Sequence, residues 1–557
     1  MAIRALFLAI LLLTACGQTA LGREPVRARK AMVVSQEPFA TDVGVTVLKN
    51  GGNAVDAAVA VAFALAVTHP TAGNLGGGGF LLVRFADGRS GFIDFREKAP
   101  QAASRDMYLD SEGKLTDQSR IGWRAAGVPG TVRGLELAHK KWGRKPWSEL
   151  VQPAVALARD GVVLSYAEAR GLRNTKLLSR FPESQRIFHK GGLFFEPGET
   201  LVQPELAAVL SRIAANPDDF YTGETARRLA AEMAANGGLI TADDLRAYRA
   251  LERKPIAGGY KGYELLSAPP PSSGGIGLVQ ILGMLEGTGY EKAGAGSAAA
   301  IHYVAEAFRR FYADRAEHLG DSDFHKVPVS GLLNKDYIAR RRSTIDPGYA
   351  TPSDNLSHGN APAFESSETT HFNVVDEEGN AVALTYTING GYGSGVTVPG
   401  LGFLLNNEMD DFAAKPGEPN MYGLVQGEAN AIQPGKRPLS AMTPTIVTKE
   451  GKLFMVVGAP GGSRIITGVT QVFLNVVDFG MTVQQAVDQP RFHHQWKPDR
   501  LYLERGFSPD TKLLLERRGH VLEEIASVAS VEAILAGADG YLHGAQNGRS
   551  SGKAAGY

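Results

Sequence analysis

The sequence lacks the features of a disulfide scaffold, a nucleic-acid-binding protein or a polybasic membrane protein. Its 557 residues include one cysteine, Cys16, so no disulfide can form within the chain. The 58 basic and 58 acidic residues give a formal net charge of zero. No basic run carries interleaved aromatic residues, and we therefore expect no nucleic-acid partner. Nothing in the sequence points to a metal or another cofactor.

The N-terminus is the only segment that suggests where in the cell the protein is located. Arg4 precedes an apolar run at residues 5–13, which is too short to span a bilayer and fits the core of a signal peptide. Residues 13–17 read LTACG and resemble a bacterial lipobox, with residues 1–16 as the signal and Cys16 as the lipidated residue. The alternative is an ordinary secretory signal cleaved after Ala20. Either reading predicts export to the periplasm, with membrane contact only through an acylated Cys16.

The composition is that of a globular protein with a sizeable core. Hydrophobic residues make up 44% and charged residues 21% of the chain. A chain of this length forms either several ordinary domains or one large layered domain. The Gly run at 76–79 is not followed by Gly-Lys-Ser/Thr, so it predicts close backbone packing before a sheet edge and not a phosphate loop. Residues 345–368 lose periodicity, which predicts an exposed segment.

Alternation and apolar runs place the main elements. Strands are expected at 31–35, 80–85, 91–96, 374–375, 381–388 and 453–458, and helices at 54–67, within 123–252, at 278–285 and at 464–479. Turn residues at 377–380 join two of these strands into a hairpin.

Four motifs carry the functional signal. Thr369-Thr370-His371 stands at the start of the hairpin, and it is followed by NNEMDDF at 406–412, KRPLS at 436–440 and PGGSR at 460–464. Together they resemble the small subunit of a γ-glutamyltransferase (glutathione hydrolase), an N-terminal-nucleophile hydrolase. The resemblance covers residues 30–557. It implies an α/β (α+β layered) fold, a four-layer αββα sandwich that periodicity alone does not establish.

The resemblance also implies self-cleavage. An internal threonine lacks a base, whereas an N-terminal threonine carries an α-amine with a pKa of about 7.7–8.0. The Glu368–Thr369 bond must therefore be cut, by attack of the Thr369 hydroxyl on the Glu368 carbonyl and hydrolysis of the resulting ester. The products are a large subunit (30–368) and a small subunit (369–557), which form a heterodimer. Thr370 is adjacent, but Thr369 aligns with the family's nucleophile.

By the same resemblance, other residues complete the catalytic centre. Thr387 holds the Thr369 hydroxyl, and Asn389 contacts the amino-acid end of the substrate. Gly461 and Gly462 lie between an expected strand and a helix N-terminus, a geometry that stabilises an oxyanion. A tight turn that simply needs glycine is the plainer reading of this pair.

A γ-glutamyl donor presents an α-carboxylate and an α-ammonium. The resemblance places Arg96 against the carboxylate, although Arg96 could instead pair with Glu97 or Asp94. Glu408 and Asp411, three residues apart, are assigned to the ammonium.

Ser440 completes the carboxylate pocket. The next residue, Ala441, departs from the family's Ser-Ser pair and cannot donate a side-chain hydrogen bond. Tyr422 is expected to gate the site from a loop at 420–430.

These assignments predict a self-processing γ-glutamyl hydrolase/transferase that acts on glutathione and related small molecules through a γ-glutamyl-Thr369 ester. One rival is an acylase of the same fold acting on glutaryl or cephalosporin-type side chains, which lack the ammonium. Another is a lipid-anchored binding protein for glutamyl peptides that never matures. The adjacent His493 and His494 should point apart and be structural.

Overall fold

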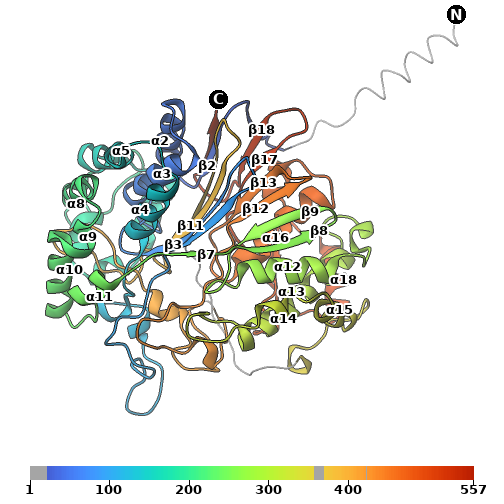
Figure 1. Ribbon diagram of the computed structural model, residues 1–557. Coiled ribbons are helices and arrows are strands. Elements are labelled where there is room, and N and C mark those ends of the chain that lie inside the picture. Colours follow the sequence, from blue (N-terminus) through green and yellow to red (C-terminus); the bar gives the residue numbers. More distant parts are fainter. Residues whose placement is uncertain (1–21, 357–368, 422) are drawn as a thin grey trace, which may run out of the picture.

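The computed structural model describes residues 22–356, 369–421 and 423–557. Two seven-stranded sheets lie face to face between two helical layers, which is the predicted αββα sandwich (Figure 1). In the order of pairing, one sheet contains β1 (Val26–Ala28), β18 (Leu542–Gln546), β17 (Glu532–Ala536), β13 (Lys452–Gly458), β12 (Thr445–Lys449), β9 (Tyr263–Ser267) and β8 (Ile256–Tyr260). The other contains β19 (Lys553–Gly556), β2 (Met32–Ser35), β10 (Thr370–Val375), β11 (Ala381–Thr387), β3 (Gly78–Arg84), β4 (Ser90–Asp94) and β7 (Leu251–Arg253).

One helical layer packs on the sheet of β10 and β11 and the other on the sheet of β12 and β13 (Figure 1). The first side holds α2 (Pro38–Lys49), α3 (Ala54–Thr68), α4 (Thr131–Trp142), α5 (Trp147–Asp160), α8 (Pro204–Ala215), α9 (Asp219–Thr222), α10 (Glu224–Ala235) and α11 (Ala242–Ala247). The second holds α12 (Gly274–Leu285), α13 (Ala298–His318), α14 (Val329–Leu332), α15 (Lys335–Ser343), α16 (Arg464–Val477), α17 (Val483–Asp488) and α18 (Pro509–Arg517). Smaller elements are α6 (Tyr166–Asn174), α7 (Pro182–Phe188), the pair β5 (Val162–Val163) and β6 (Thr200–Leu201), and a sheet of β14 (Phe492–His493), β15 (Leu501–Glu504) and β16 (Leu522–Ile525).

The helix α3 shows why the sequence signal was strong. All fifteen of its residues are buried, as its all-round apolar pattern predicts. Asn53 and Asp56 form a capping box at its N-terminus, in which each side chain accepts a hydrogen bond from the other residue's backbone N–H. The expected hairpin, the strand at 453–458 and the helix from 464 are likewise confirmed as β10–β11, β13 and α16.

Three local expectations need correction. The glycine run does pack closely, since a Cβ at Gly77 would lie 2.0 Å from the Thr387 carbonyl oxygen. However, it leads into β3, an interior strand between β11 and β4, and not to a sheet edge. The helix expected from 278 begins at Gly274. A Cβ at Gly274 would lie 2.5 Å from the Met442 carbonyl oxygen, so this close approach favours glycine, a residue that sequence reading does not assign to a helix.

The segment at 345–368 is exposed only in part of its described length. Ser353 is fully buried, and its hydroxyl accepts a hydrogen bond from Arg309 at 2.6 Å. Its carbonyl accepts one from the Trp496 indole at 3.0 Å. Tertiary hydrogen bonds of this kind leave no periodic trace in the sequence. Residues 357–368 lie outside the described residues.

Strands from both sides of the Glu368–Thr369 bond pair with one another within each sheet. In one sheet β10 pairs with β2 and β11 pairs with β3, and in the other β1 pairs with β18 and β12 pairs with β9. Backbone ladders would therefore join the two predicted subunits without a disulfide.

Candidate active site

Thr369 lies directly before β10, beside the last residue of β11. The register pairs Thr370 with Tyr386, which places Thr369 opposite Thr387. The two hydroxyl oxygens are 3.5 Å apart, with Thr387 as donor, and the backbone N–H of Asn389 donates to the Thr387 hydroxyl at 2.8 Å. Thr369 is only 5% exposed. The antiparallel register thus brings together the three residues that the sequence singled out around the nucleophile.

A pocket of about 310 Å³, including its mouth, opens at Thr369. It gathers most of the residues predicted for the site, namely Arg96, Thr369, Thr387, Asn389, Glu408, Asp411, Ser440 and Gly462. Asn389 follows β11 with a positive φ of 71°, so it lines the pocket from a turn and not from the strand itself. Its amide donates to the Asn407 carbonyl at 2.9 Å. Cys16, Glu368 and Tyr422 lie outside the described residues.

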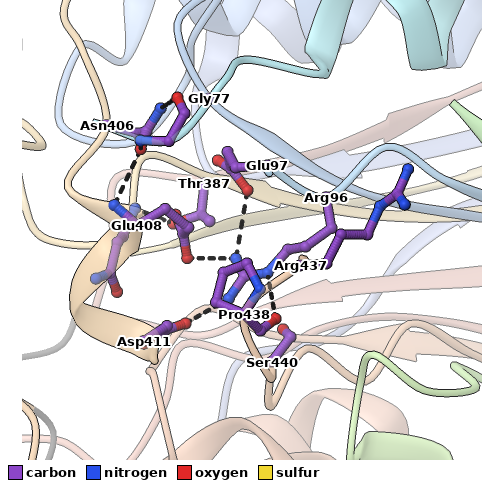
Figure 2. Close-up of polar contacts among 12 residues, drawn as sticks. Gly77, Arg96, Glu97, Thr387, Asn406, Glu408, Asp411, Arg437, Pro438 and Ser440 are labelled. Atoms are coloured by element: carbon purple, nitrogen blue, oxygen red, sulfur yellow. Dashed lines mark hydrogen bonds and ion pairs between the residues drawn. The ribbon is translucent and has the colours of Figure 1, made fainter. Parts of the chain in front are cut away.

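Arg96 is buried within a ring of carboxylates (Figure 2). One terminal nitrogen contacts Glu408 and lies 3.5 Å from Glu97, and the other contacts Asp411. Its Nε donates to the Pro438 carbonyl at 3.3 Å. Arg96 therefore lines the pocket and also pairs with Glu97, and its contact with a donor carboxylate stays a prediction. The 3₁₀ turn Glu408–Asp411 presents its first and last residues to the same guanidinium.

Burial sets the protonation of this cluster. Burial raises the pKa of Glu97 to about 7, although the Arg96 guanidinium opposes the shift. Burial also raises the pKa of Glu408 well above its ordinary value, again against Arg96. For Arg96 itself burial acts to lower the pKa, but Glu408 and Asp411 together keep it above the ordinary value. The carboxyls of Glu97 and Glu408 thus hold a proton more tightly than exposed ones, while Arg96 stays charged.

The glycine turn connects β13 to α16 at the far wall. Gly461 and Gly462 have φ of 142° and 55°, a region that favours glycine. The carbonyls of Gly461 and Gly462 accept the first hydrogen bonds of α16, from Arg464 at 3.0 Å and Ile465 at 3.2 Å. Gly462 lines the pocket, whereas Gly461 packs beside Val528. The turn therefore requires glycine and also lies at a helix N-terminus, where backbone N–H groups favour an anion.

Comparison with known proteins decides the family. The γ-glutamyltranspeptidase family model matches residues 40–557. The chain belongs to this family. It is 53% identical over 530 residues to a glutathione hydrolase proenzyme of Escherichia coli K12, covering 94% of this chain and 91% of the relative. It is also 39% identical over 541 residues to an acylase ACY 1 proenzyme of Pseudomonas sp. SE83, covering 95% and 94%.

Solved structures agree on the fold. A cephalosporin acylase from Bacillus halodurans superposes with a TM-score of 0.85 at 26% identity, covering 96% of this chain and 97% of that chain. A γ-glutamyltranspeptidase from Helicobacter pylori gives 0.57 at 42% identity, covering 61% of this chain and 96% of that one.

The segment 440–442 contains Ala441, at the position where the resemblance implies a second serine. The Ser440 hydroxyl accepts a hydrogen bond from the Met442 backbone at 3.0 Å, and the Ala441 methyl lines the pocket. The Ser440 carbonyl accepts two hydrogen bonds from Ser273, one from its hydroxyl at 2.8 Å and one from its backbone at 2.9 Å. These bonds fix the loop that carries Ala441.

A buried polar row behind the nucleophile was not predicted. His371 and Asn373 alternate with Thr370 and so share the face of Thr369. The His371 ring lies 2.8 Å from the Thr385 hydroxyl and 2.9 Å from the Asn373 side-chain oxygen. Burial lowers the pKa of His371 to about 3, so the ring is neutral. With both nitrogens engaged, His371 braces the strands and is not placed to act on the substrate. The Thr-Thr-His motif names the residue but not this role.

The large-subunit side also contributes residues that the sequence did not mark. On α13 the Tyr312 hydroxyl donates to the Ser463 carbonyl, and Arg315 lines the pocket. The only sequence signal is the presence of three arginines and two tyrosines in a helix that is mostly buried.

His493 and His494 point to different partners, as expected. His493 lies 2.9 Å from the Thr467 hydroxyl, and His494 lies 3.3 Å from Asp499. In the described parts of the chain, no group of three or more His, Cys, Asp or Glu side chains is arranged to hold a metal ion. Nor does any described helix combine the length and the apolarity that a membrane span requires.

Proposed function

We propose that the chain is a proenzyme that cuts itself between Glu368 and Thr369 and then hydrolyses or transfers the γ-glutamyl group of glutathione and related amides. One observation carries the proposal. The Thr369 hydroxyl opens into the same small pocket as Arg96, Glu408 and Asp411. A nucleophile beside a buried cation and two carboxyls suits an amide whose acyl group bears a carboxylate and an ammonium.

The chemistry follows from these positions. After cleavage the free α-amine of Thr369 accepts the hydroxyl proton, and the oxygen attacks the γ-carbonyl of the donor. The N–H groups at the Gly461–Gly462 turn stabilise the oxyanion, and the proton passes to the departing amine. The Thr387 hydroxyl orients the nucleophile. Water or the amine of an acceptor then attacks the γ-glutamyl ester, releases glutamate or a new γ-glutamyl amide, and returns the proton to Thr369.

The charges of the pocket complement those of the γ-glutamyl donor and so account for donor recognition. Arg96 meets the α-carboxylate, while Glu408 and Asp411 meet the α-ammonium. Ser440 and Asn389 extend the same wall. In the absence of a donor, Arg96 and the carboxylates satisfy one another, so binding exchanges one set of ion pairs for another.

The test is a matched pair of neighbouring threonines. Thr369→Ala should leave a single band of about 59 kDa without activity, whereas Thr370→Ala should yield fragments of roughly 36 and 20 kDa. Fragments of normal size from the Thr369→Ala protein would refute the assignment. A single band from the unsubstituted chain would instead support the non-maturing binding protein.

The second candidate is an acylase for glutaryl or cephalosporin-type side chains. The superposition on a cephalosporin acylase and the identity to an acylase proenzyme favour it. A glutaryl group has no ammonium for Glu408 and Asp411, and it would leave these buried carboxyls facing Arg96 alone. Comparing kcat/KM for γ-glutamyl- and glutaryl-p-nitroanilide decides between the two, and faster turnover of the glutaryl compound would establish the acylase.

We also propose export to the periplasm with acylation at Cys16. The N-terminal apolar run and the LTACG sequence at 13–17 support this. The membrane fraction of cells should contain the unsubstituted protein, and Cys16→Ala should move it to the soluble fraction. If the unsubstituted and Cys16→Ala proteins divide between the two fractions in the same way, the ordinary cleaved signal is favoured.

A further inference from the structure

Arg315 is a second buried arginine in the wall of the pocket. It is 1% exposed, and its Nη1 has no hydrogen-bond partner among the described residues. Within the described parts of the chain, it makes no ion pair with any carboxylate. A buried guanidinium with an open donor is unusual, because such groups are ordinarily fully paired.

The surroundings of Arg315 place it beside Ala441. Its Nε donates to the Ser273 hydroxyl at 3.0 Å, and Ser273 in turn donates to the Ser440 carbonyl, which belongs to the peptide that joins Ser440 to Ala441. Tyr312, one helical turn earlier, donates from its hydroxyl to the carbonyl of Ser463, which follows the glycine turn. The helix α13 therefore places Arg315 in the pocket wall and Tyr312 against Ser463, another residue of that wall. Burial lowers the pKa of Arg315 to about 10, so it stays protonated at neutral pH.

The Nη1 of Arg315, unpartnered among the described residues, is significant because the guanidinium of Arg96 is already engaged. Every nitrogen of the Arg96 guanidinium already has an acceptor, in Glu408, Asp411 and the Pro438 carbonyl. A donor carboxylate that meets Arg96 must compete with two protein carboxyls. Arg315 offers the same pocket a positive charge without that competition.

We propose that Arg315 binds the α-carboxylate of the γ-glutamyl donor through Nη1, on the side of the pocket where Ala441 stands. This inference rests on the proposed function. In this chain the guanidinium supplies a charge-assisted hydrogen bond at the wall where a second serine hydroxyl is absent. Arg96 and Arg315 then hold the carboxylate between them, and Glu408 and Asp411 are left for the ammonium.

The test compares the unsubstituted enzyme and an Arg315 variant on two donors that differ only in the charge at the α-carboxylate. The donors are γ-glutamyl-p-nitroanilide and its α-carboxamide analogue, which keeps the shape and removes the charge. A charge-assisted bond should contribute on the order of ten- to hundredfold to the discrimination between them. Arg315→Gln should reduce the ratio of the two kcat/KM values by about that factor, and Arg315→Lys should restore part of it.

Arg310 is the matched control. It is fully buried on the same helix, pairs with Glu306 at 2.7 Å and does not line the pocket. Arg310→Gln should change turnover of both donors by the same factor. An unchanged ratio in Arg315→Gln would overturn the inference and leave Arg315 a structural residue. If the unsubstituted enzyme cleaves neither donor, the proposed function itself fails.

A structure of the processed, unsubstituted enzyme with L-glutamate bound gives a readout that needs no variant. A carboxylate oxygen within hydrogen-bond distance of Arg315 Nη1 is the expected result. A glutamate carboxylate held by Arg96 and Ser440 alone, with Arg315 out of reach, would overturn the inference even if the Arg315 variants did not mature.

Discussion

Replacing Arg96 by Met should destabilise the protein far more at pH 8 than at pH 5. The substitution keeps an unbranched chain of similar length but removes the cation that, among the described residues, contacts Glu97, Glu408 and Asp411. Removing one partner of a buried ion pair typically costs about 3–5 kcal/mol, because the remaining charge stays desolvated. Here up to three carboxyls lose their counter-charge, so we expect the upper part of that range at pH 8.

The pH dependence follows from the direction of the carboxyl shifts. Glu97 has a folded-state pKa of about 7 against an ordinary value of 4.5, and the pKa of Glu408 is also raised. A carboxyl with a raised folded pKa binds more protons in the folded state, so stability falls as pH rises from the unfolded pKa to the folded one. Without Arg96 both pKa values rise further, and the window of lost stability widens upward. Below about pH 5 the raised pKa values keep Glu97 and Glu408 largely protonated in the folded state, and most of the loss should vanish.

Thermal unfolding followed by circular dichroism at pH 5, 6.5 and 8 measures this. The difference in Tm between the Arg96→Met and unsubstituted proteins should grow with pH, and adding Glu97→Gln should shrink it at pH 8. Arg437→Met is the matched control, since Arg437 is equally buried but its partner Asp94 keeps Arg253 at 2.6 Å. A Tm difference for Arg96→Met that is the same at all three pH values would refute the electrostatic reasoning and point to lost packing.

The remaining predictions concern donor binding and the stability of the fold. Asp411→Ala should raise KM for γ-glutamyl donors without blocking self-cleavage, and an unchanged KM would remove Asp411 from the site. Ala441→Ser should tighten glutathione binding by up to roughly tenfold, and no gain would mean that Arg315 or Ser440 already satisfies that oxygen. Gly458→Ala should lower the free energy of unfolding, measured by chemical denaturation, by about 1–3 kcal/mol, because its Cβ would lie 2.2 Å from the His371 ring. Gly88→Ala is the control, since its Cβ would meet no atom within 4 Å and the substitution should cost only the strain of its positive φ.

Elements with a strong local signal could be predicted from the sequence, and those set by tertiary contacts could not. The helix at 54–67 was predictable because apolar residues cover every face and Asn53 caps it. The nucleophile strand was predictable from alternation and turn residues, and its register then fixes Thr369 opposite Thr387. The docking of Ser353 was not, because it depends on Arg309 and Trp496, which are distant in sequence.

The site divides in the same way, and the division has a physical cause. Residues that face the reacting atoms recur as short motifs, so Thr369, Arg96, Glu408 and Asp411 could be named before any fold was known. Their state could not, because it is set by burial and by distant charges. Arg96 and Arg315 carry the same group on the wall of one pocket, yet one is saturated with carboxylates and the other keeps an open nitrogen. Arg315 reaches the pocket from α13, and its Nε donates to Ser273, whose hydroxyl donates to the Ser440 carbonyl. The contacts that set the state of each arginine thus come from segments far apart in the sequence, and no short motif records them.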